Sequence, residues 1–392
     1  MARWRRGFAI PSAPVPSVSS MRSSSPSSRL LHLDALKAVA AQLIVLHHLS
    51  AYGPVSESLE NQLPTLQALL YDYGRMAVQV FLVVGGYLSA RGLAPDGVAL
   101  RGEVPELLWR RYLRLVLPFM AAVLLSVGCA ILVEPWLPEL TPDAAGPAEL
   151  LAHALLLHDL LGVEALTVGA WYVAIDMQLF VLLMGLLWLV RWQPAPRVLG
   201  LALVTAVLAA SLFHFNRLPQ LDAWAAYFFG AYGLGALVHL IGVHPALRGR
   251  RSVAMLALFL LAGAALAVEF RGRLALALCT AVVLALWQLR QASHRRHAQA
   301  AERVVPRPAS RLTQLLAHLG THSYALFLVH FSVLLLVNAL FASGAPERSL
   351  AGFVAMLAAW ALSNLAAILF YRWIEQPASR VHLALPALLR RI

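Results

Sequence analysis

The sequence predicts an all-α protein, a polytopic membrane helical bundle of about ten transmembrane helices with both termini in the cytoplasm. Three observations carry this prediction. Hydrophobic residues make up 60% of the 392 positions and charged residues only 13%, a more apolar composition than soluble globular domains have. Windows of about 20 apolar residues, enough to cross roughly 30 Å of hydrocarbon as helix, recur along the chain. The segments between these windows alternate between basic and non-basic composition.

Ten segments fit a membrane-spanning helix. They are 30–51, 73–94, 113–133, 169–190, 197–213, 222–241, 252–268, 273–289, 320–341 and 350–373. Leu and Ala fill them, without the sustained alternation of polar and apolar residues that transmembrane β-strands need. The segments therefore predict a helical bundle and argue against a β-barrel.

The loops between the spans differ in charge. Segment 290–319 is rich in arginine, whereas 134–168 holds six acidic residues and no Lys or Arg. Because positively charged loops tend to stay in the cytoplasm, 290–319 and both termini are predicted inside and 134–168 outside. The net charge of +12 then reflects topology and contact with anionic membrane lipids, and nucleic acid is not expected as a partner.

One membrane domain accounts for most of the chain. We assign it residues 30–376, with 290–319 as a cytoplasmic loop within it. Residues 1–29, rich in Ser, Pro and Arg, are predicted to be a disordered basic tail, in which Met21 is an alternative start. Residues 377–392 form a cytoplasmic C-terminal tail. No internal repeat of the kind found in transporters is evident.

The first span carries polar groups at both ends. Asp34 and Lys37 are three residues apart and can pair with each other near the headgroups. His48 lies eleven positions after Lys37, which is about three helical turns plus roughly 20° and a rise of about 16 Å. Lys37 and His48 therefore share one face of the helix, whereas His47 points about 100° away.

A second polar group, Asp176, lies about 7 Å inside the span that begins near Trp171. His48 has a similar predicted depth. A carboxylate beside an imidazole holds the ring as a general base and stabilises its protonated form. We therefore expect His48 and Asp176 to act together, although equal depth does not by itself establish contact.

Arginines and glycines mark two further segments. Arg110, Arg111 and Arg114 are predicted to precede the third span, where they either anchor lipid headgroups or bind the phosphates of an anionic cofactor. Gly85 and Gly86 in the second span permit close approach of a helix or a ligand.

The last two spans hold three more polar groups. His330 lies deep in its span, where a hydrogen bond to another helix and a functional role are both open. Tyr324 lies near the inner end of the same span. Glu375, at the inner end of the final span, is expected to interact with a neighbouring arginine.

Six stretches, in order along the predicted spans, resemble segments of the acyltransferase-3 family of integral membrane acyltransferases. "LDALKAVAAQLIVLHH" resembles the family's opening segment, with Lys37 where Arg is usual and His48 in the place of the His thought to be catalytic. "AVQVFLVVGGYL" resembles its second-helix segment, with Gly85 where Ser is usual. "WYVAIDMQLF" resembles a Trp-led segment, with Asp176 in place of Glu. The other stretches are "RRYLRLVLP", "SYALFLVHFSV" and "FYRWIEQP".

The resemblance implies an O-acyltransferase of the bacterial inner membrane. The expected reaction moves an acyl group, expected to be acetyl, from cytoplasmic acyl-CoA to a hydroxyl of an extracytoplasmic or lipid-linked saccharide. His48 and Asp176 are the expected catalytic residues, and Lys37, Arg111 and Arg114 are expected to hold the donor phosphates. We expect no metal and no permanently bound cofactor, and the sequence predicts no particular oligomeric state.

Two other functions remain open from the residues alone. In a transporter or flippase for a lipid-linked or polymeric glycan, the stripe from Lys37 to His48 would line a path for protons or substrate. The other function is a catalytically inactive binding or sensor protein of the same fold. Such a protein would tolerate Lys37 where the family usually has Arg, and Asp176 where it usually has Glu.

Overall fold

A computed structural model describes residues 31–142, 145–193, 196–298, 310–344 and 350–381. All regular secondary structure in these ranges is helical. Nine of the described helices are long and apolar enough to cross a membrane. Helices α1 (Leu31–Leu49) and α2 (Gly53–Gln62), which meet at 89°, raise the number to as many as ten. The predicted all-α polytopic bundle is confirmed, while the tail 1–29 and residues 382–392 lie outside the described residues.

The other helices follow in chain order. They are α3 (Pro64–Gly74), η1 (Arg75–Ala77), α4 (Val78–Leu93), α5 (Val104–Val133), η2 (Pro138–Leu140), α6 (Pro147–Ala154), α7 (Ala170–Val190), α8 (Pro196–Phe213), η3 (Phe215–Arg217), η4 (Pro219–Leu221), α9 (Ala225–Val243), η5 (Pro245–Leu247), α10 (Arg251–Val268), α11 (Gly272–Ala298), α12 (Arg311–Thr321), α13 (Ser323–Ser343), α14 (Ala351–Phe370), η6 (Tyr371–Glu375) and α15 (Gln376–Ala378).

Two predicted boundaries are corrected. Helix α5 begins at Val104, more than two turns before the predicted 113, so the arginines of this segment lie within the helix rather than before it. The apolar window misses these turns because they contain charges, and Glu106 pairs with Arg110 one turn later. Segment 290–319 is not one continuous loop, because α11 continues to Ala298 and α12 forms at its end.

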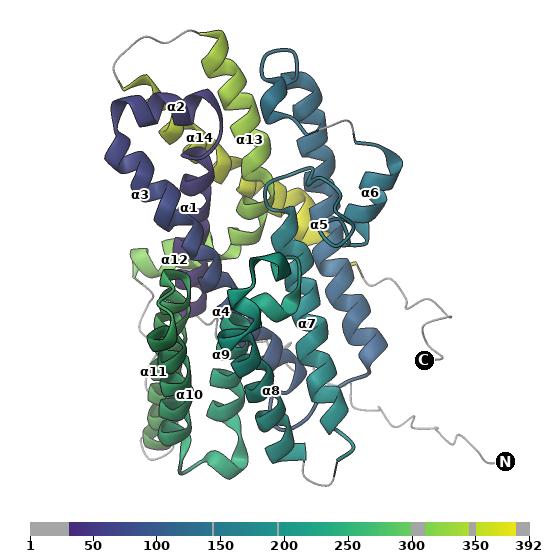
Figure 1. Ribbon diagram of the computed structural model, residues 1–392, viewed down its shortest axis with the longest axis vertical. Coiled ribbons are helices and arrows are strands. Elements are labelled where there is room, and N and C mark those ends of the chain that lie inside the picture. Colours follow the sequence, from purple (N-terminus) through teal and green to yellow (C-terminus); the bar gives the residue numbers. More distant parts are fainter. Residues whose placement is uncertain (1–30, 143–144, 194–195, 299–309, 345–349, 382–392) are drawn as a thin grey trace, which may run out of the picture.

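Helices α4 and α9 cross closely at the centre of the bundle (Figure 1). The crossing depends on two glycines, because a Cβ added to Gly86 would overlap the carbonyl oxygen of Tyr232. A Cβ on Gly235 would overlap that of Val83. Nearly every residue of α9 is buried, whereas α10 buries only four, so α10 lies at the periphery. The small residues of the second span therefore serve helix packing at Gly86.

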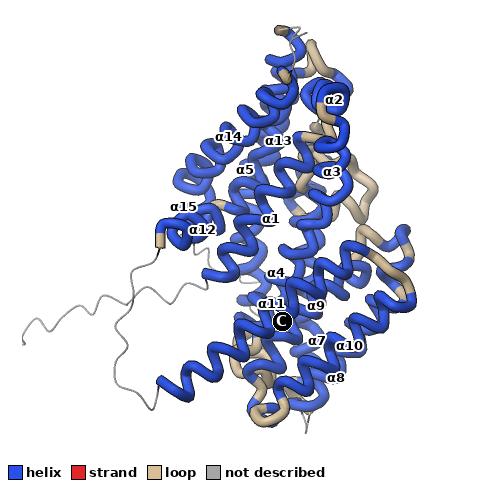
Figure 2. The backbone as a smooth tube through the Cα atoms, turned by 90° about the vertical axis from the view of Figure 1, so that its left-hand side faces the viewer, coloured by secondary structure: helices blue, strands red, loops and turns tan. Residues whose placement is uncertain are grey.

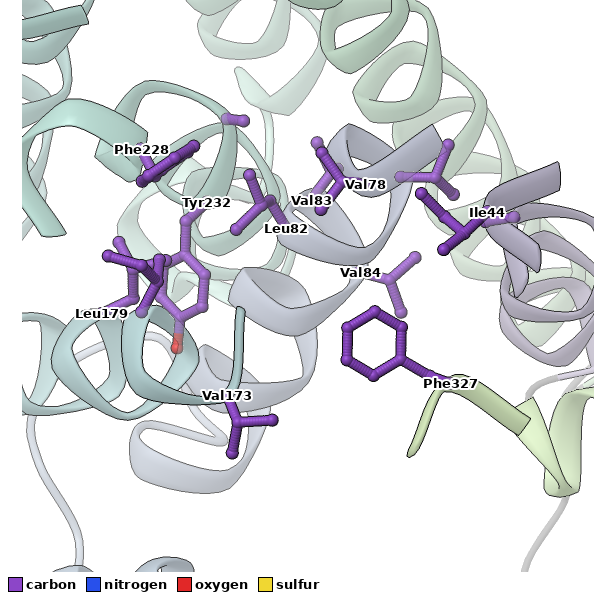
Figure 3. Packing of buried hydrophobic residues seen from close by; sticks show 14 of the residues in the cluster. Ile44, Val78, Leu82, Val83, Val84, Val173, Leu179, Phe228, Tyr232 and Phe327 are labelled. Atoms are coloured by element: carbon purple, nitrogen blue, oxygen red, sulfur yellow. The ribbon is translucent and has the colours of Figure 1, made fainter. Parts of the chain in front are cut away.

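Figure 3 shows the apolar layer around this crossing. Residues of α4 lie between Tyr232 and Leu179 on one side and Phe327 on the other, with Val84 close to the Phe327 ring. These side chains belong to one continuous buried cluster that runs through α1, α4, α7, α9 and α13. The two polar centres described below are embedded in this layer.

The ends of the bundle form two faces. Helices α12 and α15 lie together on one side, which we call the α12 face, and α2 and α3 lie on the opposite side, the α2 face (Figure 2). Helix α1 connects them, because its Asp34 carbonyl packs on Gly320 of α12 and its other end leads into α2. The α12 face corresponds to the predicted cytoplasmic side.

A cluster of amide side chains ties α1 to α14. Trp360 donates its Nε1–H to Oε1 of Gln42 at 2.6 Å, and Gln42 donates from Nε2 to Oδ1 of Asn364 at 2.8 Å. The Asn364 amide returns a hydrogen bond to Gln42 at 3.2 Å. Amide pairs of this kind satisfy polar groups within hydrocarbon and fix how two helices rotate against each other. They therefore orient the histidine-bearing face of α1.

Candidate active site

His48, near the C-terminal end of α1, pairs with a histidine of α13. Nδ1 of His48 lies 2.7 Å from Nε2 of His330, and Nδ1 of His330 lies 3.1 Å from the carbonyl oxygen of Leu326. A carbonyl oxygen only accepts, so Nδ1 of neutral His330 carries the proton and its Nε2 accepts. Nδ1 of His48 is then the donor of the pair. This leaves the Nε2 lone pair of His48 free to act as a base.

The surroundings of the pair hold both rings in place. His330 is completely buried, whereas His48 keeps partial exposure. Helix α1 ends one residue later, and the turn into α2 uses Gly53 at φ +81°, followed by a proline. Asn338 of α13 fixes this turn, because its Oδ1 accepts from the Val55 backbone at 2.9 Å and its Nδ2 donates to the Tyr52 carbonyl at 3.4 Å. The same helix therefore positions both His330 and the end of α1.

The neighbouring His47 faces a different part of the bundle. Its ring lies 5.7 Å from that of Tyr71 on α3, and its Cβ lies against Gly74. His47 also interacts electrostatically with Arg75. The prediction that the two adjacent histidines point to different neighbours is confirmed.

A second polar centre lies between α5 and α7. Arg111 forms an ion pair with Asp176 through Nη2, and its guanidinium lies 5.2 Å from the centre of the Phe180 ring. Asp176 is buried, and the Arg111 side chain is 25% exposed. Nη1 of Arg111 makes no hydrogen bond to the described residues, so this donor remains free for a ligand.

Two more residues complete the environment of this pair. Tyr232 of α9 and Tyr172 of α7 both interact electrostatically with Arg111 and Asp176. A Cβ on Gly85 would lie 3.6 Å from Oδ1 of Asp176, which is an ordinary contact distance. The two adjacent glycines thus differ, since Gly85 faces the ion pair and Gly86 faces the backbone of α9.

The expected contact between His48 and Asp176 does not form. No hydrogen bond or ion pair joins them within the described residues, because Asp176 pairs with Arg111 and His48 pairs with His330. Their depths match along the chain, but depth does not determine the direction in which a side chain points around its helix. A buried arginine needs a counter-ion, and the carboxylate of α7 supplies it.

The third polar cluster lies at the α12 face. Nζ of Lys37 is 2.9 Å from Oδ1 of Asp34, so these two residues pair near the end of α1, as their spacing allows. Glu375 interacts electrostatically with both Arg114 and Lys37. The end of the last span therefore lies near the first and third spans. Arg114 is exposed and makes no ion pair within 4 Å in the described part of the chain. Lys37 and Arg114 therefore lie in one cluster that an anion can reach.

Aromatic rings connect the two buried centres. Tyr172, beside the ion pair, lies 5.3 Å from the ring centre of Phe327, and Phe327 lies 6.2 Å from that of His330. Aromatic side chains thus lie between the histidine pair and the ion pair.

Sequence reasoning identifies most residues of the histidine pair, the ion pair and the charged cluster at the α12 face, but not all of their partners. From the sequence, His330 is open between a structural and a functional role, and its position as the partner of His48 follows only from the packing of α13 against α1. The signal is a buried histidine in the middle of an apolar span.

Comparison with protein families gives one match. The family model described as an acyltransferase domain, acyltransferase-3, covers residues 30–372. No curated protein and no solved structure matches the chain at a significant level. The match spans nearly the whole chain and includes nearly every residue of the three polar centres. The chain therefore belongs to the acyltransferase-3 family and is an integral membrane acyltransferase.

Proposed function

We propose that this acyltransferase moves an acyl group, acetyl in the simplest case, from cytoplasmic acyl-CoA to a hydroxyl of an extracytoplasmic or lipid-linked saccharide. The observation that carries the proposal is the histidine pair, in which hydrogen bonding to His330 leaves Nε2 of His48 unprotonated. An imidazole with a fixed tautomer and a free lone pair is suited to take a proton from a hydroxyl.

The reaction uses this base in one transfer. Nε2 of His48 takes the hydroxyl proton as the acceptor oxygen attacks the thioester carbonyl. The carbon–sulfur bond breaks, the CoA thiolate leaves, and the imidazolium returns the proton to that sulfur. The products are the O-acyl saccharide and free CoA. His330 accepts the hydrogen bond from Nδ1 of His48 throughout and serves as a positioning residue.

The donor is proposed to enter from the α12 face. Lys37 and Arg114 lie there with partly free charges, and they suit the phosphates of CoA. Lys37 and His48 are about 16 Å apart along α1, a distance that an extended thiol arm has to cover. Arg111, about one helical turn from Arg114 on α5, offers Nη1 as a further donor. The thioester can therefore reach His48 while the nucleotide remains at the α12 face.

Asp176 has a different role from the one its sequence position suggests. It holds Arg111 in place through the ion pair, so we assign it a positioning role for Arg111 rather than for His48. Because CoA thioesters are cytoplasmic, the α12 face is the cytoplasmic side in this proposal, and the membrane is the bacterial inner membrane.

Incubation of the purified protein with radiolabelled acetyl-CoA and a bacterial lipid extract tests the reaction. Label should enter a lipid-linked or extracted saccharide with the wild type. His330→Gln, whose side-chain oxygen still accepts from His48, should retain more activity than His330→Leu, which should lose about tenfold in kcat, the value of one hydrogen bond. Unchanged pH–rate profiles in both variants, with normal rates, would show that His330 does not position the base.

A further inference from the structure

The α2 face contains a cleft whose residues have no role in the chemistry described so far. Its volume is about 800 Å³, and it lies among the first residues of α4, α7, α9 and α11. Its charged lining residues are Arg75, Asp159, Asp222, Arg271 and Arg273. The cleft is therefore polar, although it opens between membrane-spanning helices.

Two chains of contacts link the cleft to the region of the histidine pair. Arg75, which lines it, interacts electrostatically with His47, the neighbour of His48 in the sequence. Trp171, another lining residue, is 6.0 Å from Tyr172, whose ring contacts Phe327 beside His330. A series of aromatic contacts therefore runs from the cleft to His330, the partner of the proposed base.

The arginines of the cleft have no carboxylate partner. In the described part of the chain, none of the three forms an ion pair within 4 Å. Arg271 donates to Oδ1 of Asn216 at 2.6 Å and to the Leu212 carbonyl at 2.8 Å, while its Nε–H is buried without a partner. Arg273 stacks on Tyr227 at 5.0 Å. Neighbouring groups thus fix two guanidinium groups in place, and the electrostatic interaction of Arg271 with Glu269 is longer than an ion pair.

A polar side chain at the cleft provides a further sign of a ligand. Gln79 is 7% exposed as a whole residue and lines the cleft, and its side chain makes no hydrogen bond to any described residue. Its amide atoms are not fully buried, so they are available to a ligand that enters the cleft. On the opposite side, burial and the charge of Asp222 raise the pKa of Asp159, which places the two carboxylates close together.

We infer that this cleft binds the acceptor, and that the acceptor is a saccharide carrying a phosphate or carboxylate. Carboxylates and an amide hydrogen-bond sugar hydroxyls, and the partly exposed Trp171 ring provides a flat apolar surface for the sugar. The three arginines outnumber the two carboxylates, and arginine forks match phosphate and carboxylate oxygens. The ligand's role as acceptor rests on the proposed function, whereas the binding itself does not.

Binding without any acyl donor tests the site separately from the reaction. The full-length protein in phosphatidylcholine nanodiscs is titrated with glucose 1-phosphate, glucose and inorganic phosphate, and tryptophan fluorescence is followed. Glucose 1-phosphate should bind at least about tenfold more tightly than either of the others, because only it uses both the arginines and the polyol-binding groups. Trp171→Phe should remove the signal. Equal binding of glucose would refute the anionic class, and equal binding of phosphate would refute the saccharide.

Variants locate the binding in the cleft. Arg75→Gln, which removes an exposed guanidinium with one weak backbone contact, should weaken glucose 1-phosphate binding about tenfold. Gln79→Met should weaken the binding of both sugars. Arg217→Gln is the matched control, because Arg217 lies on the same face, pairs with Glu269 and is absent from the cleft lining. Equal affinity in Arg75→Gln and Arg217→Gln would overturn the proposal.

Two further measurements complete the test. One distinguishes an acceptor from a lipid headgroup, and the other shows whether the cleft assignment or the proposed reaction is wrong. If phosphatidylglycerol in the discs abolishes glucose 1-phosphate binding, the cleft holds a lipid headgroup and the acceptor assignment is wrong. In acyl-transfer assays, Arg75→Gln should raise the acceptor KM about tenfold without changing the donor KM. If Arg75→Gln leaves acyl transfer unchanged, the cleft is not the acceptor site, and the proposed reaction is unaffected. If glucose 1-phosphate binds but no acyl transfer occurs, only the proposed reaction is wrong.

Discussion

The two buried polar centres, the histidine pair and the ion pair, satisfy their polar groups inside the membrane in different ways. The pair of His48 and His330 is neutral, and each hydrogen bond within it can be satisfied without any charge. Arg111 and Asp176 are both charged and depend on each other, since an isolated ion in a membrane interior costs several kcal/mol. The neutral pair can therefore change its protonation during a reaction, whereas the ion pair is suited to hold a fixed charge.

The comparison predicts that the two centres fail differently when mutated. Loss of a catalytic base removes rate and leaves no unpaired charge, because imidazole to alanine deletes a neutral side chain, so its cost in stability is that of one lost hydrogen bond and a small void. Loss of either ion in the second centre leaves the other unpaired within the bundle. Activity and stability should therefore separate between the centres.

The largest expected effect is on the rate of His48→Ala. Removal of a positioned general base should lower kcat by about 10²–10⁴ while the protein still inserts and folds. His47→Ala is the control on the next residue, and it should retain activity because His47 packs on Tyr71 and Gly74. Initial rates with radiolabelled acetyl-CoA, at equal protein in membranes, provide the measurement. An inactive His47→Ala beside an active His48→Ala would reverse the assignment.

Much of this arrangement follows from the sequence, for physical reasons. Hydropathy predicts the helices because a bilayer admits few spanning structures, and helical periodicity separates His48 from His47 because adjacent residues point about 100° apart. The partner of His48 cannot be predicted in the same way. Depth along a span is a local property, whereas pairing depends on which faces of distant helices meet. Asp176 therefore matches His48 in depth but meets Arg111.

The start of α5 illustrates a second limit. Charged residues in its first turns lower the hydropathy there, so a search for apolar windows misses the start of the helix. The helix nevertheless begins at Val104, because Arg110 pairs with Glu106 and Arg111 with Asp176. A charge in a membrane helix is tolerated once a partner exists, and the partner is invisible to composition. The cleft at the α2 face shows the same limit, because its arginines come from segments far apart in the sequence.

The next largest effect is expected on stability in the ion pair. Asp176→Ala should lower the free energy of unfolding by about 3 kcal/mol, the lower end for a broken buried pair, because Arg111 is partly exposed. Arg111→Met combined with Asp176→Leu should recover part of that loss, because no unpaired charge remains. Thermal unfolding of the detergent-solubilised variants measures it. Additive destabilisation in the double variant would mean that the two charges do not stabilise each other.

Substitution of the adjacent glycines Gly85 and Gly86 of α4 should have a smaller effect on stability. Gly86→Ala should destabilise the protein by roughly 1–3 kcal/mol, since its Cβ would overlap the α9 backbone. Gly85→Ser should be tolerated better, because its Cβ would lie at an ordinary contact distance from Asp176 and Tyr232. The same thermal assay compares them. A Gly85→Ser variant less stable than Gly86→Ala would contradict the packing of α4 on α9.

The smallest effect concerns charges at the α12 face, which should behave unlike the buried pair. Lys37 and Arg114 are partly or fully exposed, so their replacement by Gln should leave unfolding nearly unchanged. If they bind donor phosphates, each replacement should raise the KM for acetyl-CoA about tenfold with little change in kcat. Arg110→Gln is the matched control, because Arg110 is exposed on the same helix and already pairs with Glu106. Equal donor KM values for Arg114→Gln and Arg110→Gln would show that Arg114 serves only as a headgroup anchor. A clear difference between them would place the donor at the α12 face, where exposed charge serves binding and buried charge serves the fold.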